Sequence, residues 1–141
     1  MSRYVVDAGV AIKWVLKEDL DTYALRLTTG DHTLIAPDFM YAECGNVLWK
    51  RVRSGSLAAQ EARKSFQLLC AAPLEITSTK SLADEALSIA MSTDRAVYDC
   101  IYLTLAIHEE APFVTADEKL INALKSGPFG RHLLWVGDIP E

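Results

Sequence analysis

The sequence predicts a three-layer α/β/α fold, in which helices cover both faces of a mostly parallel central sheet. Short apolar runs alternate along the chain with longer segments of helical periodicity. This alternation requires crossover connections, which make neighbouring strands parallel. Half of the residues are apolar and 23% are charged, as in a chain with a buried core. Because the 141 residues contain no linker-like segment, we expect a single domain over 1–141.

The strands and helices are expected in regular order. The strand candidates are short apolar runs at 4–6, 34–36, 74–76, 113–115 and 132–136. The helix candidates have apolar residues three or four positions apart and lie at 10–16, 21–28, 37–53, 58–71, 81–93, 97–110 and 117–125. Pro37 is expected to open the longest helix, and Gly30 and Pro73 are expected to stop the helices before them.

Composition argues against several classes of protein. No run is long and apolar enough to span a bilayer and no signal peptide precedes the first strand, so we expect a cytoplasmic protein. Three widely spaced cysteines without a Cys-x-x-Cys pair indicate reduced thiols, and the histidines show no zinc-ligand spacing.

The net charge of −5 argues at first against a nucleic-acid ligand, because Lys and Arg drive phosphate binding. The balance changes if the acids are clustered, since two divalent cations would bring −5 to −1 (−5 + 4). Lys50, Arg51 and Arg53 form a basic run that is a candidate for RNA binding. The alternative is a solvated helix end, where basic residues favour the negative pole of the helix dipole.

Two acids are expected at the carboxyl ends of strands, where ligands bind in open α/β sheets. Asp7 follows the strand at 4–6, and Asp117 follows the strand at 113–115. Asp7 could instead be the N-cap of the next helix. Thr115 and Glu118 match a capping box in which Thr115 caps and Glu118 reaches back, which leaves Asp117 free for a site. Thr115 is also a candidate to support that site.

Two further acids lie in apolar helical surroundings. Glu43 shares a helix face with Phe39 and Val47, where an ionised group is costly unless it is paired or bound to metal. Asn46 lies one turn from Glu43 and is a candidate for support, although Glu43 could also be a surface residue at the margin of this face. Asp99 is the only charged residue in 96–107, and its position in the first helical turn is also favourable for the dipole.

Asp7, Glu43, Asp99 and Asp117 together would form a site of oxygen ligands alone. Such a site suits Mg²⁺ or Mn²⁺ rather than structural zinc. Bound divalent ions can polarise a phosphoryl oxygen, activate water and stabilise the leaving oxygen of a phosphodiester. The four carboxylates therefore indicate a metal-dependent phosphodiester hydrolase.

The order of these segments resembles that of PIN-domain ribonucleases, in particular the toxins of VapBC-type toxin–antitoxin systems. The similar segments cover essentially the whole chain and are Tyr4–Ala8 with Val10–Trp14, Pro37–Leu48, Tyr98–Tyr102 and Phe113–Asp117. The resemblance implies a PIN-like fold, endonucleolytic cleavage of RNA with Mg²⁺ or Mn²⁺, a homodimer and inhibition by a small antitoxin. It also implies that Asp7, Glu43, Asp99 and Asp117 form the acidic site.

One position departs from the family. Two residues after the first Asp the family often has Ser, Thr or Asn, whereas this chain has Gly9. A supporting hydroxyl or amide is thus missing, but no ligand is lost. Gly9 favours the alternative of a PIN-like scaffold that binds RNA or protein without cutting.

Two other magnesium-dependent classes fit less well. Asp7-Ala8-Gly9 lacks the second Asp of the Asp-x-Asp pattern of haloacid-dehalogenase phosphohydrolases. A receiver domain would need paired acids at the first strand, and these are absent as well. Which RNA such an enzyme cuts depends on groove shape and base stacking.

Overall fold

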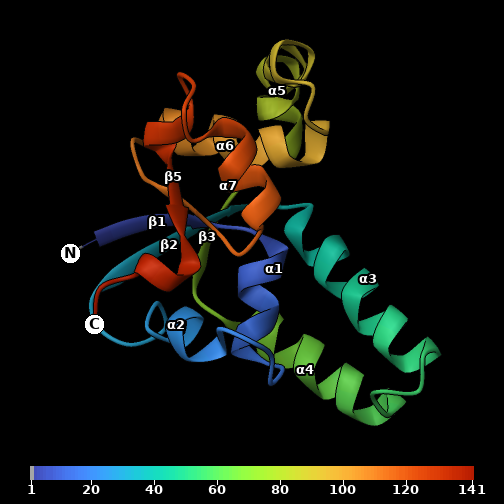
Figure 1. Cartoon of the computed structure of the whole chain (residues 1–141). Coiled ribbons are helices and arrows are strands. Elements are labelled where there is room, and N and C mark those ends of the chain that lie inside the picture. The colour runs from blue at the N-terminus through green and yellow to red at the C-terminus, as the bar shows by residue number, and fades with distance from the viewer. Residues whose placement is uncertain (1) are drawn as a thin grey trace.

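The computed structural model describes residues 2–141, and its centre is a five-stranded sheet in which every neighbouring pair of strands is parallel. The strand order is β3-β2-β1-β4-β5 (Figure 1). The strands are β1 (Ser2–Val6), β2 (His32–Pro37), β3 (Leu74–Thr77), β4 (Phe113–Thr115) and β5 (Leu133–Trp135). The predicted parallel sheet is therefore confirmed.

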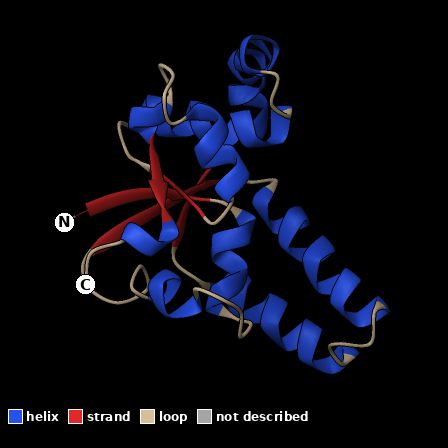
Figure 2. Cartoon of the chain, viewed as in Figure 1, coloured by secondary structure: helices blue, strands red, loops and turns tan. Residues whose placement is uncertain are grey.

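Helices cover both faces of this sheet. They are α1 (Ala8–Ala11), α2 (Asp21–Leu25), α3 (Met40–Arg53), α4 (Ala59–Ala71), α5 (Thr79–Thr93), α6 (Val97–Glu109) and α7 (Glu118–Leu124). In Figure 1, α5, α6 and α7 lie above the sheet, and α1, α2 and α4 lie below it. Figure 2 shows the same three layers, with α3 and α4 forming a hairpin that projects to one side. Within residues 2–141, no helix is long and apolar enough to cross a membrane.

The core lies between the central strands and α6. Val5, Val6, Phe113 and Val114 are fully shielded from solvent, and α6 buries seven consecutive residues, Cys100–Ala106. An almost wholly apolar helix is typical of an element that is surrounded on several sides. Asp99 lies at the start of this buried stretch, so the core fixes its position.

Several predicted boundaries shift by a few residues. Pro37 does not open a helix, because it is the last residue of β2 and pairs with Thr77 of β3. Asp38 also precedes α3, whose N-cap is Phe39, and its Oδ1 accepts hydrogen bonds from the Thr79 backbone N–H at 2.9 Å and from the Thr79 hydroxyl. The predicted helix at 10–16 is α1 followed by a 3-10 turn, Ile12–Trp14. The predicted helix at 21–28 ends early, at Leu25, and Gly30 has a positive φ of 87°.

The strand order creates one place where ligands are expected. β1 is flanked by β2 on one side and by β4 on the other. The strands β1, β2 and β3 follow one another in one direction across the sheet, whereas β4 and β5 lie on the other side of β1, so the strand order reverses between β1 and β4. In open α/β sheets, ligands bind beyond the carboxyl ends of the strands at this switch point. The residues that immediately follow β1 and β4 include Asp7 and Asp117.

Candidate active site

Asp7 joins β1 to α1 and is held in one orientation. Its Oδ1 accepts a hydrogen bond from the Val10 backbone N–H at 2.9 Å, which makes Asp7 the N-cap of α1. Its Oδ2 accepts a hydrogen bond from the Thr115 hydroxyl at 2.9 Å. The two alternatives considered for Asp7 are therefore compatible, because a capping carboxylate still has lone pairs for another ligand.

The predicted capping box at Thr115 is wrong. The N-cap of α7 is Asp117, whose Oδ1 accepts from the Leu120 backbone N–H at 3.1 Å. Thr115 is instead the last residue of β4, and its side chain is turned toward Asp7 because β4 pairs with β1 through Val6 and Val114. The Thr115 hydroxyl also accepts from the Asp117 backbone N–H at 3.1 Å. One buried threonine thus links the two strand-end acids.

Glu43 lies in the first turn of α3 and is partly buried. Its Oε1 accepts a hydrogen bond from the Tyr102 phenol at 2.5 Å. Tyr102 is buried between the rings of Phe39 and Phe113, with centroid distances of 5.2 Å and 5.5 Å. Sequence reasoning did not assign Tyr102, although a tyrosine in a buried helix needs a partner for its hydroxyl.

Asp99 lies in the first turn of α6 and is partly buried. Burial raises the pKa of its carboxyl above the ordinary 3.8, Asp117 raises it further, and Arg95 lowers it. Asp99 and Asp117 are therefore close enough to repel each other, although Asp117 is exposed at the surface.

The other carboxylates are coupled in the same way. Burial raises the pKa of Asp7 from 3.8 to about 7, Glu43 and Asp99 add to the rise, and the hydrogen bonds from Val10 and Thr115 oppose it. Burial also raises the pKa of Glu43, where the Tyr102 hydrogen bond lowers it and Asp99 raises it. The structure thus brings Asp7, Glu43, Asp99 and Asp117 into one electrostatically coupled group.

The donor set of this group fits a hard divalent cation. All four side chains offer carboxylate oxygens, and a cation would relieve their mutual repulsion. The nearby thiols do not compete, because burial raises the pKa of Cys44 to about 12 and also raises that of Cys100. Within 2–141, no three acidic, histidine or cysteine side chains converge tightly enough to enclose an ion alone. Mg²⁺ usually retains several waters and is bound through one or two carboxylates, so a Mg²⁺ site does not require three protein ligands.

A groove of about 370 Å³ opens beside Asp7 and Asp117. Gly9, Lys13 and Glu18 line it together with these two acids. A Cβ added at Gly9 would lie 3.5 Å from Asp7 Oδ1, at ordinary contact distance, so the groove has room for the side chain that Gly9 lacks. Sequence reasoning did not assign Lys13 or Glu18, because their contacts depend on the fold.

The structure distinguishes among the predicted supporting and basic residues. Asn46 is exposed on α3, and no hydrogen bond joins its side chain to the four acids in the described chain. Lys50 is exposed at the far end of the same helix. Arg51 forms an ion pair with Glu18, and the Arg53 guanidinium stacks 4.6 Å from the centroid of the Trp49 ring.

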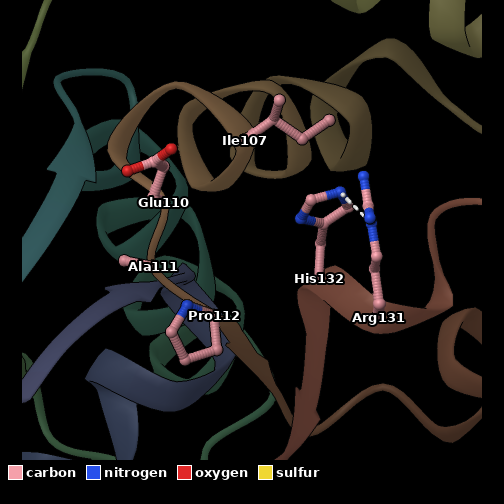
Figure 3. Close-up of a pocket in the computed structure, with 6 residues that line it drawn as sticks. All are labelled: Ile107, Glu110, Ala111, Pro112, Arg131 and His132. Carbon is pink, nitrogen blue, oxygen red and sulfur yellow. Dashed lines mark hydrogen bonds between the residues drawn. The ribbon is translucent and has the colours of Figure 1, made fainter.

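A larger cavity, of about 700 Å³, lies at the opposite edge of the sheet (Figure 3). It is lined by Ile107, Glu110, Ala111, Pro112, Arg131 and His132, which precede β4 and β5 or end α6. None of the four predicted acids lines it. The candidate site is therefore the smaller groove at the carboxyl edge.

Comparison with known proteins agrees with this geometry. The profile of the PIN domain matches residues 4–125. The chain belongs to the PIN domain family. The matched segment contains all four acids, and the family resemblance drawn from the sequence is confirmed. The chain is also 28% identical over 120 residues to Ribonuclease VapC3 of Pyrobaculum aerophilum, covering 84% of this chain and 92% of that protein.

Solved structures share the fold of this PIN domain. A crystal structure of PAE2754 from Pyrobaculum aerophilum matches with a TM-score of 0.69 and 22% identity, over 96% of this chain and 85% of that one. VapBC2 from Rickettsia felis, bound to a DNA fragment from its promoter, matches with a TM-score of 0.63 and 18% identity, over 94% of this chain and 98% of that one. At these identities the likeness establishes the PIN-like α/β fold.

Proposed function

We propose that this PIN domain is a Mg²⁺- or Mn²⁺-dependent endoribonuclease and the toxin of a VapBC-type pair. The observation that carries the proposal is the coupling of Asp7, Glu43, Asp99 and Asp117 at the switch point of the sheet. The similarity to a protein named Ribonuclease VapC3 supports RNA as the substrate.

In this reaction the chain itself would hold the four carboxylates in the orientation that a divalent ion needs. Asp7 is fixed by Val10 and Thr115, and Glu43 is fixed by Tyr102. Asp99 and Asp117 are placed by the first turn of α6 and the N-terminus of α7, where the helix dipoles favour their charge. A bound divalent ion would supply the Lewis acidity for attack of water on the phosphodiester. Preorganised ligands reduce the reorganisation that the reaction requires.

The decisive test combines chelation with one substitution. The purified protein is incubated with a panel of structured and single-stranded RNAs, with and without excess chelator, and the cut sites are mapped. We expect cleavage in Mg²⁺ or Mn²⁺, none in chelator, and none by the Asp99→Asn variant. The amide keeps the shape of the side chain but loses the charge that would hold the cation. Cleavage that persists in excess chelator would contradict the proposal.

A non-catalytic scaffold is the second candidate, and Gly9 is the observation that favours it. The hydroxyl or amide that PIN domains often carry at this position is absent. Thr115 nevertheless offers a hydroxyl to Asp7 from the neighbouring strand, so the first acid is supported without it. RNA binding without cleavage in either metal, across the whole panel, would favour the scaffold.

The proposed partner is a small antitoxin that fills the acidic groove. An arginine directed at the carboxylates would suit the site, because a guanidinium pairs with a carboxylate in bidentate fashion. The similarity to a structure named as a toxin–antitoxin complex from Klebsiella pneumoniae, with a TM-score of 0.59 and 13% identity, supports this partner. We also propose that the protein acts in the cytoplasm as a homodimer. Purification after co-expression with the neighbouring open reading frame should recover a small bound protein.

A further inference from the structure

We propose that Lys13 contacts a phosphate of the RNA backbone in the groove, and that Glu18 is the positioning residue that holds Lys13 there. This inference rests on the proposed function, because it assigns the substrate contact of the same site. Neither residue belongs to the four carboxylates, and neither was predicted from the sequence.

Lys13 lies inside the groove rather than at its rim. It is in the 3-10 turn Ile12–Trp14 that continues α1, directly after the helix that Asp7 caps. Its side chain is only 10% exposed, and it lines the groove together with Asp7 and Asp117. A lysine that is exposed to this small extent has lost most of its hydration, which is costly unless its ammonium has partners.

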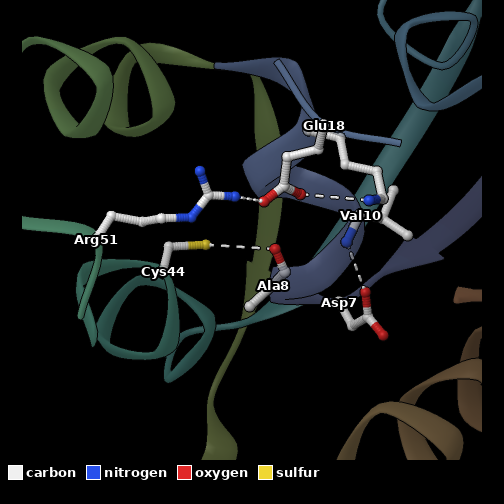
Figure 4. Close-up of polar contacts among 7 residues, drawn as sticks. Asp7, Ala8, Val10, Glu18, Cys44 and Arg51 are labelled. Carbon is white, nitrogen blue, oxygen red and sulfur yellow. Dashed lines mark hydrogen bonds and ion pairs between the residues drawn. The ribbon is translucent and has the colours of Figure 1, made fainter. Parts of the chain in front are cut away.

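Glu18 is a shared partner for two cations. The Lys13 ammonium donates to Glu18 Oε1 at 3.3 Å, and the Arg51 guanidinium donates to the other carboxylate oxygen, Oε2. Figure 4 shows Glu18 between Arg51 and the helix that follows Asp7. Glu18 is 17% exposed, so its carboxylate is also largely enclosed. Lys13 and Glu18 line the groove, and through Glu18 they are linked to Arg51 of α3, which does not line it.

The charges of this trio do not cancel. One carboxylate faces one ammonium and one guanidinium, which leaves one excess positive charge. In residues 2–141, Glu18 is the single ion-pair and hydrogen-bond partner of the Lys13 ammonium, which has three donors. Lys13 forms no ion pair with Asp7 or Asp117, although all three line the same groove. The ammonium thus has donors left for an anion.

The groove would therefore offer both charges that a metal-bound phosphodiester requires. The carboxylates suit a cation, and Lys13 suits the negative charge of a phosphate next to it. Glu18 limits the freedom of the lysine side chain, so less entropy is lost when the phosphate binds. Arg51, which the sequence suggested as a direct RNA contact, acts in this arrangement through Glu18.

The test compares two lysines that are four residues apart. Lys13→Met removes the charge but keeps the apolar stem, and Lys17→Met makes the same change at an exposed lysine of the next loop. Binding of a fluorescein-labelled single-stranded RNA of random sequence is measured by anisotropy against salt concentration. All four carboxylates are kept, Ca²⁺ replaces Mg²⁺ as a hard cation for oxygen ligands, and gels check that the RNA stays intact. We expect Lys13→Met to weaken binding about tenfold at low salt and to reduce the salt slope by about 0.7, the value for one phosphate contact.

The matched variants distinguish a substrate contact from a structural ion pair. Lys13→Arg should restore the salt slope, and Lys17→Met should leave it unchanged. Glu18→Gln should keep the slope but lower kcat/KM of the otherwise unaltered protein, because the lysine retains its charge and loses its orientation. The inference is overturned if Lys13→Met and Lys17→Met give the same slope, or if Lys13→Met lowers only the melting temperature. A wild type that cuts no RNA while the slope still depends on Lys13 would contradict the proposed function alone.

Discussion

The two cavities at opposite ends of the parallel strands differ in volume and in charge. We call the end where the strands begin the amino edge, and the end where they finish the carboxyl edge. The amino edge has the larger cavity, about 700 Å³, and the ionisable groups lining it are Glu110, Arg131 and His132. Arg131 donates to His132 Nε2 at 3.3 Å, and burial together with Arg131 lowers the pKa of His132, so the imidazole is neutral near pH 7. The negative charge of Glu110 and the positive charge of Arg131 then cancel in the net charge of this cavity. The carboxyl edge has the smaller groove, yet its acids repel each other.

The larger cavity volume therefore does not coincide with the proposed site. The acids at the carboxyl edge follow β1 and β4 or lie in the first turns of α3 and α6. Among the groups that shift their pKa values, Arg95 beside Asp99 is the one cation. An arrangement that is unfavourable without a ligand indicates a function, because stability alone would not select it. The cavity at the amino edge has no such repulsion, because the charges of Glu110 and Arg131, which line it, are opposite.

The largest expected effect is a loss of RNA cleavage when one carboxylate charge is removed at the carboxyl edge, compared with the same change at the amino edge. Asp117→Asn should lower cleavage by on the order of 100-fold or more, since a metal ligand contributes at least as much as a residue that supports one. The helix should be unaffected, because Asn is as good an N-cap as Asp and can still accept from Leu120. Glu110→Gln makes the same chemical change at the amino edge and should alter cleavage by less than about twofold. Initial rates of RNA cleavage in saturating Mn²⁺ measure the effect of each variant. Equal losses of cleavage in the two variants would contradict the assignment of the site to the carboxyl edge.

A smaller effect is expected on the stability of the metal-free protein. The pKa of Asp7 is raised to about 7 in the folded state, so between about pH 4 and pH 7 the folded chain binds more protons than the unfolded chain. The stability contributed by the protonated form is therefore present at low pH and is lost as the pH rises through 7. Melting temperatures in chelator should fall across this range.

Asp7→Asn should flatten this pH dependence and raise the melting temperature at pH 8 by several degrees. The side-chain oxygen of Asn can still accept from the Val10 N–H as the cap of α1. Glu110→Gln is the matched control and should retain the wild-type profile. Mn²⁺ at a hundredfold excess over its dissociation constant should stabilise the wild type by about 2.7 kcal/mol, and it should stabilise the Asp7→Asn variant by less. A wild type that is as stable at pH 8 as at pH 5 without metal would contradict this account.

The features that could be predicted from the sequence depend on short stretches of chain. Asp7 and Asp117 follow strands, and in a parallel sheet all such positions lie at one edge, so no tertiary contact had to be known. Asp99 was identified because it is the single charged residue in 96–107, next to the stretch of α6 that the core buries. Local pattern was therefore sufficient for the order of strands and helices and for the places of these acids in it, although several helix bounds were wrong.

The features that were missed depend on distant contacts. Tyr102 reaches Glu43 across 59 residues, and Arg51 reaches Glu18 across 33. The capping box was misread for the same reason, since Thr115 has a better partner in Asp7, 108 residues away. Local sequence matched both arrangements of Thr115, and only the pairing of β1 with β4 decides between them.

The smallest expected effect concerns the basic end of α3. Lys50 is exposed, and Arg53 stacks on Trp49, which is 53% exposed, so both groups can reach a phosphate outside the groove. Lys50→Ala and Arg53→Ala should each weaken binding of single-stranded RNA about two- to threefold at low salt, and each should reduce the salt slope by up to about 0.7. Arg131→Ala removes an arginine from the amino edge and should change neither value. Anisotropy titrations at several salt concentrations measure these effects. Slopes that are the same for all three variants and the wild type would mean that the basic run is a solvated helix end, and that RNA is held at the carboxyl edge by the groove alone.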